Sequence, residues 1–221
     1  VDKVTLTAEN KTITDTLHDG SIIKLNQNST LSFPEKFEKH SRNVQLSGEA
    51  FFEVEHDDKQ PFIIDVAGAH IKVLGTSFNV KELAEEHSVQ VYVQSGIVQL
   101  YSLTEERDTL SLIIKEGETG ILNTESGVAE MPDDVGLNAN EISWMNDTFV
   151  FDGVRLDYVT EFLENYYAIK IVLQKDTLSE MLLTASFKND NIDEIMEVIA
   201  GSFDLKLKKE NSTYYLDEVE N

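Results

Sequence analysis

The chain contains no cysteine, three prolines and one tryptophan in 221 residues. The absence of cysteine excludes disulfide frameworks, zinc sites built from thiolates and catalysis by a thiol. No apolar run is longer than about five residues, whereas a membrane-spanning helix needs about 20. The first residue is valine and no signal peptide is visible, so we expect a piece of a longer protein whose targeting or anchoring segments lie outside this sequence.

Basic residues are also scarce. The chain has 18 lysines and arginines against 41 aspartates and glutamates, which gives a net charge of −23. The acidic residues are spread along the chain, and there is neither an acidic tail nor a basic stripe. Such a surface repels phosphate backbones and argues against nucleic acid as a partner. Because 41% of the residues are hydrophobic, the chain is still able to bury a core.

The residue types that usually carry chemistry do not form a recognisable site. The five histidines are scattered without metal-ligand spacing, and no phosphate-binding or dinucleotide-binding glycine pattern is present. Gly75-Thr76-Ser77 lacks the second glycine of a nucleophile elbow. We therefore predict no catalytic, metal-binding or cofactor-binding residues. Glu49 and Glu53 could serve as acids, but we favour an ion pair between one of them and nearby Arg42.

Residues 4 to about 130 contain short apolar alternations separated by turn residues. Val89, Val91 and Val93, for example, alternate with polar neighbours, which is typical of a strand with one buried face. The Ser95-Gly96 pair that follows predicts a hairpin. Many short strands without a helical period predict an all-β, sandwich-like or roll-like domain over residues 1–130.

The pattern lapses at residues 131–143, which are mostly polar and are predicted to be a linker. Beyond them, apolar residues recur at helical spacing, and Asn191 with Glu194 forms a capping-box pattern before a second helix. Residues 144–221 are therefore predicted to form a small α+β domain of order β-α-β-β-α-β-β, in which two helices cover one sheet.

Tyrosines are the remaining candidates for a functional surface. Tyr167 ends the first predicted helix, and Tyr214 and Tyr215 lie on the last predicted strand. Alternation places one residue of a neighbouring pair inward and the other outward. Edge strands can pair with strands of a partner. We therefore expect partner docking at Tyr167, Tyr214 and Tyr215, with strand addition along residues 213–217.

Several blocks together carry a family resemblance. They are Leu17-x-Asp19-Gly20-Ser21, Arg42-x-Val44-x-Leu46-x-Gly48-Glu49-Ala50-Phe51-Phe52-Glu53-Val54, Pro61-Phe62 and Val73-Leu74-Gly75-Thr76-x-Phe78-Asn79-Val80. They closely resemble the FecR family of transmembrane anti-sigma factors, and Trp144 with Phe149-x-Phe151 resembles the small domain that follows in such proteins. The signature residues are expected to be structural: Gly48, Glu49, Phe51, Phe52, Gly75, Phe78, Asn79 and Trp144.

The resemblance implies a non-enzymatic periplasmic sensor region that controls nutrient uptake. Such proteins receive a signal from the N-terminal signalling domain of a TonB-dependent outer-membrane transducer. They pass it to an extracytoplasmic-function sigma factor through a membrane helix and a cytoplasmic segment, both absent from this chain. The second domain is similar to the N-terminal signalling domains of secretins and TonB-dependent transducers, so docking between like folds is the expected mode.

Two other functions stay open at the level of sequence. A carbohydrate-binding module would show outward aromatic residues on one face of a sheet. A hydrolase would place Glu49 and Glu53 in a shared cleft.

Overall fold

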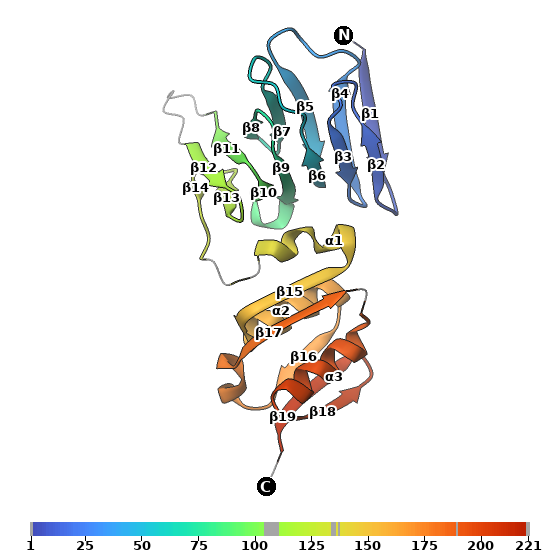
Figure 1. Cartoon of the computed structure of the whole chain (residues 1–221), viewed down its shortest axis with the longest axis vertical. Helices are drawn as coiled ribbons and strands as arrows, with labels where there is room; N and C mark the ends of the chain where they lie inside the picture. The colour runs from blue at the N-terminus through green and yellow to red at the C-terminus, as the bar shows by residue number, and fades with distance from the viewer. Residues whose placement is uncertain (1, 104–110, 134–135, 137, 189, 220–221) are drawn as a thin grey trace. The chain divides into compact units, whose positions relative to one another are not determined.

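The structure is a computed structural model that describes residues 2–103, 111–133, 136, 138–188 and 190–219. It divides into two compact units, residues 1–133 and residues 134–221 (Figure 1). Within the described residues, no helix is both long and apolar enough to cross a membrane.

The first unit consists of two sheets, each with seven strands among the described residues. Sheet A contains, in spatial order, β1 (Lys3–Ala8), β4 (Ser29–Pro34), β5 (Arg42–Ser47), β7 (Phe62–Val66), β8 (Ala69–Val73), β11 (Ile97–Ser102) and β12 (Ser111–Lys115). Sheet B contains β14 (Ala129–Glu130), β13 (Thr119–Asn123), β10 (Ser88–Ser95), β9 (Ser77–Leu83), β6 (Glu49–Glu53), β3 (Ile22–Leu25) and β2 (Ile13–Thr16). A short 3-10 helix, η1 (Ala84–Glu86), connects β9 to β10.

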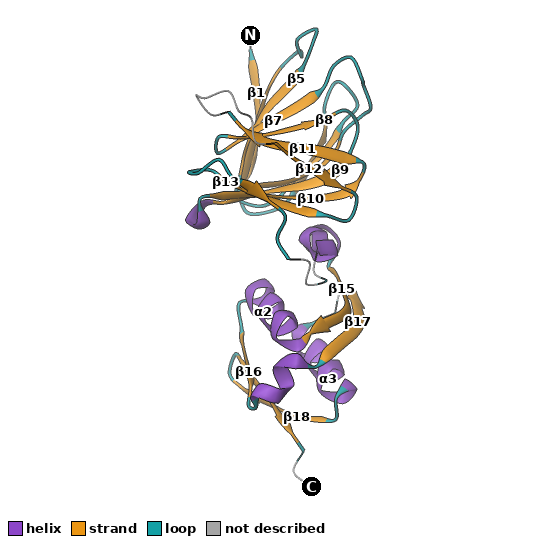
Figure 2. Ribbon diagram, turned by 90° about the vertical axis from the view of Figure 1, so that its left-hand side faces the viewer, coloured by secondary structure: helices purple, strands orange, loops and turns teal. Residues whose placement is uncertain are grey.

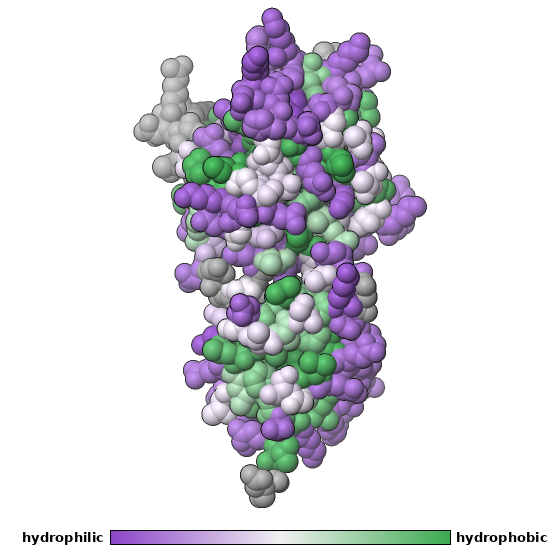
Figure 3. Space-filling view, viewed as in Figure 1, coloured by the Kyte–Doolittle hydropathy of each residue, from purple (hydrophilic) through white to green (hydrophobic). Residues whose placement is uncertain are grey.

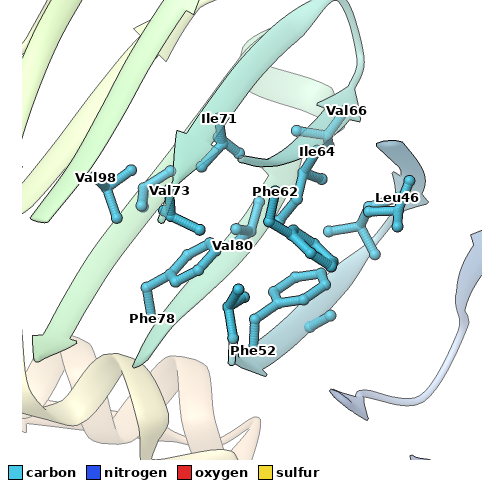
Figure 4. Packing of buried hydrophobic residues seen from close by; sticks show 14 of the residues in the cluster. Leu46, Phe52, Phe62, Ile64, Val66, Ile71, Val73, Phe78, Val80 and Val98 are labelled. Atoms are coloured by element: carbon cyan, nitrogen blue, oxygen red, sulfur yellow. The ribbon is translucent and has the colours of Figure 1, made fainter. Parts of the chain in front are cut away.

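The core of this unit lies between the two sheets, which Figure 2 shows one above the other. Side chains of both sheets meet there (Figure 4), among them Phe52, Phe62, Ile64, Ile71, Phe78 and Val80. Burying an apolar side chain of this size contributes about 1.5–3 kcal/mol to stability. The predicted mainly-β, sandwich-like architecture of the first part of the chain is confirmed.

Three glycines lie where the chain passes from one sheet to the other. Gly48 separates β5 from β6, Gly75 lies between β8 and β9, and Gly96 lies between β10 and β11. Gly48 and Gly96 have φ angles of +92° and +90°, which favour glycine. The hairpin predicted at Ser95-Gly96 is wrong, because β10 and β11 belong to different sheets. The turn residues are those of a hairpin, but β10 pairs with β9 and β13 in sheet B, whereas β11 pairs with β8 and β12 in sheet A.

The second unit contains five strands, three α-helices and two 3-10 helices among its described residues. They are η2 (Asn138–Ile142), α1 (Ser143–Asn146), β15 (Thr148–Arg155), α2 (Leu156–Tyr167), β16 (Lys170–Leu173), η3 (Asp176–Glu180), β17 (Leu182–Lys188), α3 (Ile192–Ser202), β18 (Leu205–Glu210) and β19 (Thr213–Glu218), where η marks a 3-10 helix. The β-α-β-β-α-β-β order is confirmed, and so is the capping box, in which Asn191 Oδ1 accepts from Glu194 N at 3.1 Å.

The predicted single sheet of the second unit is wrong. β15 pairs with β17 in a two-stranded sheet, and β16, β19 and β18 form a separate three-stranded sheet. Figure 2 shows α2 and α3 between them, and each helix contacts strands of both sheets. Helical periodicity reveals an apolar face, but it does not show how many sheets that face covers.

The end of the predicted linker is also different from the prediction. Residues 138–142 form η2, in which Asn140 and Ile142 are buried. Asn140 is held there because its side chain hydrogen-bonds the backbone of β15. A polar sequence at this position therefore reflects a specific side-chain contact rather than a structureless connection.

Candidate partner-docking site

Tyr214 is a core residue and not a docking residue. Its ring is buried in the apolar cluster between the sheets and helices of the second unit. Its hydroxyl donates to Asp193 Oδ1 at 2.7 Å, and Lys209 Nζ lies 5.0 Å from its ring centroid. Burial, followed by the hydrogen bond to Asp193, raises the pKa of the Tyr214 hydroxyl. The side chain links β19 to the start of α3.

Tyr167 also has a structural role. It lies at the end of α2, and its hydroxyl donates to the backbone oxygen of Asp190 at 3.0 Å. Its ring packs edge-to-face against Phe149 and Tyr166, at centroid distances of 6.0 and 5.1 Å. Burial raises its pKa. Tyr167 thus closes an aromatic cluster between α2 and β15 and joins it to the segment before α3.

Tyr215 is the half-buried tyrosine of the pair, on the opposite face of β19 from Tyr214. It lines a shallow polar pocket with Lys206, Lys208 and Asp217. Strand addition along residues 213–217 is nevertheless excluded, because β19 pairs with β16 on one side and with β18 on the other. The sequence correctly identifies a final strand but cannot tell that it is central.

The second unit has four strand edges among its described residues, and three of them carry a feature that opposes pairing inside the strand rather than only at its last residue. On β18, the exposed Lys206, Lys208 and Lys209 protect the edge, as charged residues on edge strands do. On β16, Glu164 Oε1 accepts from Ile171 N at 2.6 Å. That amide points away from β19, because the neighbouring Lys170 N donates to Ser212 O of the turn before β19.

The edge of β15 is occupied by Asn140. The amide of Val150 donates to Asn140 Oδ1 at 2.8 Å, and Asn140 Nδ2 donates to the carbonyl of Val150 at 3.0 Å. Both backbone groups of Val150 therefore point away from β17 and are satisfied by one side chain that imitates a paired strand. Because Asn140 is itself buried, this cover is fixed in place.

Along the edge of β17, the described residues provide such a cover only at the last residue of the strand, where the amide of Lys188 donates to Asp190 Oδ2 at 2.8 Å. Val150 and Ser186 face each other across the sheet. Since the backbone groups of Val150 point away from β17, those of Ser186 point to the opposite, free edge. Six successive residues of β17, from Leu182 to Phe187, are uncharged. In these residues we find no proline or charge that would oppose pairing.

Two large apolar side chains are exposed on the outer face of this two-stranded sheet. Leu182 is 61% exposed, and Val150 on the neighbouring strand is 40% exposed. Figure 3 shows hydrophobic side chains gathered over the part of the second unit where Figure 1 shows β15 and β17. Exposed apolar groups next to an unprotected edge are typical of a site that pairs with another chain. We name β17 and the outer face of β15–β17 the β17 edge site.

The signature residues of the first unit serve its architecture. Phe52 and Phe78 stack at a centroid distance of 5.4 Å in the core. A Cβ added to Gly75 would lie 2.7 Å from Cα of His56, so only glycine fits there. A Cβ added to Gly48 would collide with the side chain of Ser29, whose Oγ accepts from Glu49 N.

Phe51 differs from the other signature aromatics. It is buried, yet it lies on the opposite face of β6 from Phe52 and outside the core between the sheets. Lys24 and Asn79 are its neighbours across the strands, and Lys24 Nζ lies 5.7 Å from its ring centroid. Burial of Phe51 therefore stabilises the outer face of sheet B and not the core between the two sheets.

The two glutamates of the signature do not form a catalytic pair. Both carboxylate oxygens of Glu49 accept amide hydrogen bonds, from Asn26 and Asn79, at 2.9 Å each. Glu53 is largely exposed and lies 3.8 Å from Lys24 Nζ. These contacts join neighbouring strands of sheet B, and they remove the geometric basis for a hydrolase that uses Glu49 and Glu53.

The predicted ion pair between Arg42 and these glutamates is wrong. Arg42 Nη1 instead contacts Asp19 Oδ2 at 2.8 Å, and the Arg42 side chain is 2% exposed. Its guanidinium also donates to the backbone oxygens of Gln60, Glu55 and Leu74. Asp19 is the residue that sequence proximity missed, because 23 positions separate it from Arg42.

Two family models match the chain. The model described as FecR protein matches residues 3–99, and the one described as FecR, C-terminal, matches residues 148–216, together more than half of the sequence. The chain belongs to the FecR family of anti-sigma factors. Two crystal structures of anti-sigma factors from Parabacteroides distasonis ATCC 8503, both provisionally assigned as such, are similar to it over nearly the whole length. Each is 25% identical in sequence to this chain and matches it with a TM-score of 0.62. The two alignments cover 98% and 99% of this chain, and 100% of the crystallised chain in both cases.

No curated protein matches the chain. The FecR matches place the signature residues Gly48 to Val80 in the first family region, and the β17 edge site in the second. Trp144 precedes the second region and is half-buried in α1. Anti-sigma factors are regulatory proteins that act through contacts with a sigma factor.

Proposed function

We propose that this FecR-family chain is the periplasmic sensor region of a membrane-anchored, non-enzymatic regulator. It would receive its signal from the N-terminal signalling domain of a TonB-dependent transducer. It would relay that signal to an extracytoplasmic-function sigma factor through segments absent from this chain. The family membership supports the anti-sigma role, and the uncovered stretch of the β17 edge from Leu182 to Phe187 supports docking by the second unit.

The docking geometry that we propose is strand addition at the β17 edge site. An extended strand of the transducer domain would satisfy the outward backbone groups of Ser186, and its apolar side chains would cover Leu182 on β17. The alternation of β17 puts Thr184 and Ser186 on its exposed face, where they leave room for an incoming strand. This replaces docking at Tyr214 and Tyr215.

A binding measurement with the whole chain tests the proposal. The transducer is taken from the gene neighbourhood, where an adjacent receptor gene would identify it, and its signalling domain is immobilised for biolayer interferometry. Ser186→Lys should abolish binding, because a charge on the edge opposes strand pairing. Ser212→Lys, in the turn between β18 and β19, is the matched control and should leave binding unchanged.

Three results would contradict the proposal at different levels. No binding of the wild-type chain at high micromolar concentration would refute the transducer as partner. Loss of binding in Tyr215→Ala but not in Ser186→Lys would move the site to the other sheet. Self-association of the wild type that Ser186→Lys removes, without transducer binding, would identify a second copy of this chain as the occupant of the edge.

A further inference from the structure

A pocket on the outer face of sheet A has no part in the docking described above. Its volume is 380 Å³, within the range of roughly 300–1,000 Å³ for small-molecule sites. Its floor comes from three adjacent strands: Gln45 on β5, Asp65 on β7 and His70 on β8 face one another in one row. Asn43 and Ile63 form the next row.

The register of the sandwich fixes this outward set. Ile64, Val66 and Ile71 point into the core (Figure 4), so the alternating Asp65 and His70 must point to the opposite face. Lys36 and Glu38, from the connection between β4 and β5, line the pocket as well, and Lys3 of β1 does so from the other side. The pocket is therefore built from the sheet and from one connection that borders it.

Several polar groups of the pocket are available to a ligand. Asp65 is half-buried, and among the described residues neither a hydrogen bond nor an ion pair reaches its carboxylate. His70, directly across the strand pair, has a ring contact with Tyr101 but no ion pair with Asp65. Gln45 Oε1 accepts from Lys3 Nζ at 3.0 Å, which leaves the amide protons of Gln45 as donors.

The charges in the pocket balance. Lys3 and Lys36 offset Glu38 and Asp65, in a chain whose net charge is −23. A balanced pocket gives an ion of either sign no Coulomb advantage, whereas a hydroxyl group both donates and accepts and so suits every polar group present. The His70 and Tyr101 rings stack at 5.4 Å beside the floor and extend it with an aromatic surface. Apolar contact is supplied by Ile63 and by Pro34 at the end of β4.

We propose that this pocket binds a neutral saccharide, with Asp65 and Gln45 holding hydroxyl groups and the His70–Tyr101 pair contacting the apolar face of the sugar ring. The outward aromatic pair is the feature expected of a carbohydrate-binding surface. A FecR-family sensor with such a site would respond to a ligand directly, in addition to its transducer. The proposal does not depend on the β17 edge site.

An NMR titration of residues 1–221 tests it. The probes are glucose, galactose, N-acetylglucosamine, maltose and cellobiose, with glucuronic acid and glucosamine as charged counterparts. At least one neutral sugar should shift the backbone amides around Gln45, Asp65 and His70, and its charged counterpart should bind less well. Asp65→Asn, and independently Gln45→Ala, should weaken binding at least tenfold. Asp15→Asn, on β2 of sheet B, makes the same charge change away from the pocket and should not alter binding.

Three outcomes of this titration would contradict the proposal. If no neutral sugar shifts these amides at tens of millimolar, the proposal is wrong. It is also wrong if only the charged sugars bind, or if Asp15→Asn weakens binding as much as Asp65→Asn does. Unchanged dispersion of the amide spectrum of each variant shows that a loss of binding is not a loss of folding.

Discussion

Removal of the Arg42 side chain should destabilise the first unit strongly. The Arg42 side chain is 2% exposed and makes four polar contacts: the one with Asp19 and hydrogen bonds to three backbone oxygens in the segments around Glu55, Gln60 and Leu74. Arg42→Ala removes the cationic partner of the Asp19 carboxylate, which keeps its hydrogen bonds from Ser21, and it removes one donor from each of three backbone carbonyls. Breaking a buried pair by removing one partner costs about 3–5 kcal/mol, so we expect a loss in this range.

The companion variant separates the charge from the hydrogen bonds. Asp19→Asn removes one charged acceptor but leaves the guanidinium with its three carbonyl partners, so the cost should be about 1.5–3 kcal/mol, the value of one hydrogen bond to a charged group. Arg155→Ala is the control, because Arg155 pairs with Asp157 at an exposed surface where ion pairs contribute little.

Urea unfolding followed by circular dichroism measures these differences as shifts in the midpoint at constant slope. Hydrogen exchange of the amides in β5 and β7 shows whether the loss is confined to the first unit. A smaller loss of stability in Arg42→Ala than in Asp19→Asn would contradict this role of Arg42, and so would losses in both variants as small as that of Arg155→Ala. In that case Arg42 would be a replaceable space-filling residue rather than the link between the three segments.

Two further predictions concern the core and the pH dependence. Phe52→Ala should lower the free energy of unfolding in urea by about 3–5 kcal/mol, because Phe52 is fully buried and stacks on Phe78. A decrease below about 1 kcal/mol would show that neighbouring side chains move into the cavity. Lys209 and then Tyr214 lower the pKa of Asp193 by their hydrogen bonds, so Asp193 contributes stability above its unfolded pKa and loses it as the pH falls through the folded pKa. Thermal melts between about pH 5 and pH 2 should therefore fall more steeply for the wild type than for Asp193→Asn, and parallel curves would contradict this assignment.

The sequence correctly predicted those structural features that depend on residues close together in the chain. Asn191 and Glu194 form the capping box that their spacing indicated, and the order of elements in the second unit is the predicted one. The alternation of Val89, Val91 and Val93 correctly predicted a buried face, because all three side chains lie in the core of the first unit. These features depend on contacts within a few residues, so periodicity and capping chemistry determine them.

Long-range pairing could not be predicted in the same way. Ser95-Gly96 has the composition of a hairpin turn, yet β10 and β11 pair in different sheets. Tyr214 and Tyr215 looked like residues of an edge strand, yet β19 is the central strand of its sheet. Strand order depends on contacts between segments far apart in the chain, and no local pattern reports them.

By itself, the sequence determined that this chain buries two differently patterned cores, carries no local chemical motif and has the signature of the FecR family. The periodicity of apolar residues and the glycines at fixed positions contain that information. Tertiary structure decided which groups are available to a partner. Asn140 covers the edge of β15, and Glu164 covers part of β16. Among the described residues, β17 is left open from Leu182 to Phe187, because a backbone edge is free or occupied only after every strand has its neighbours.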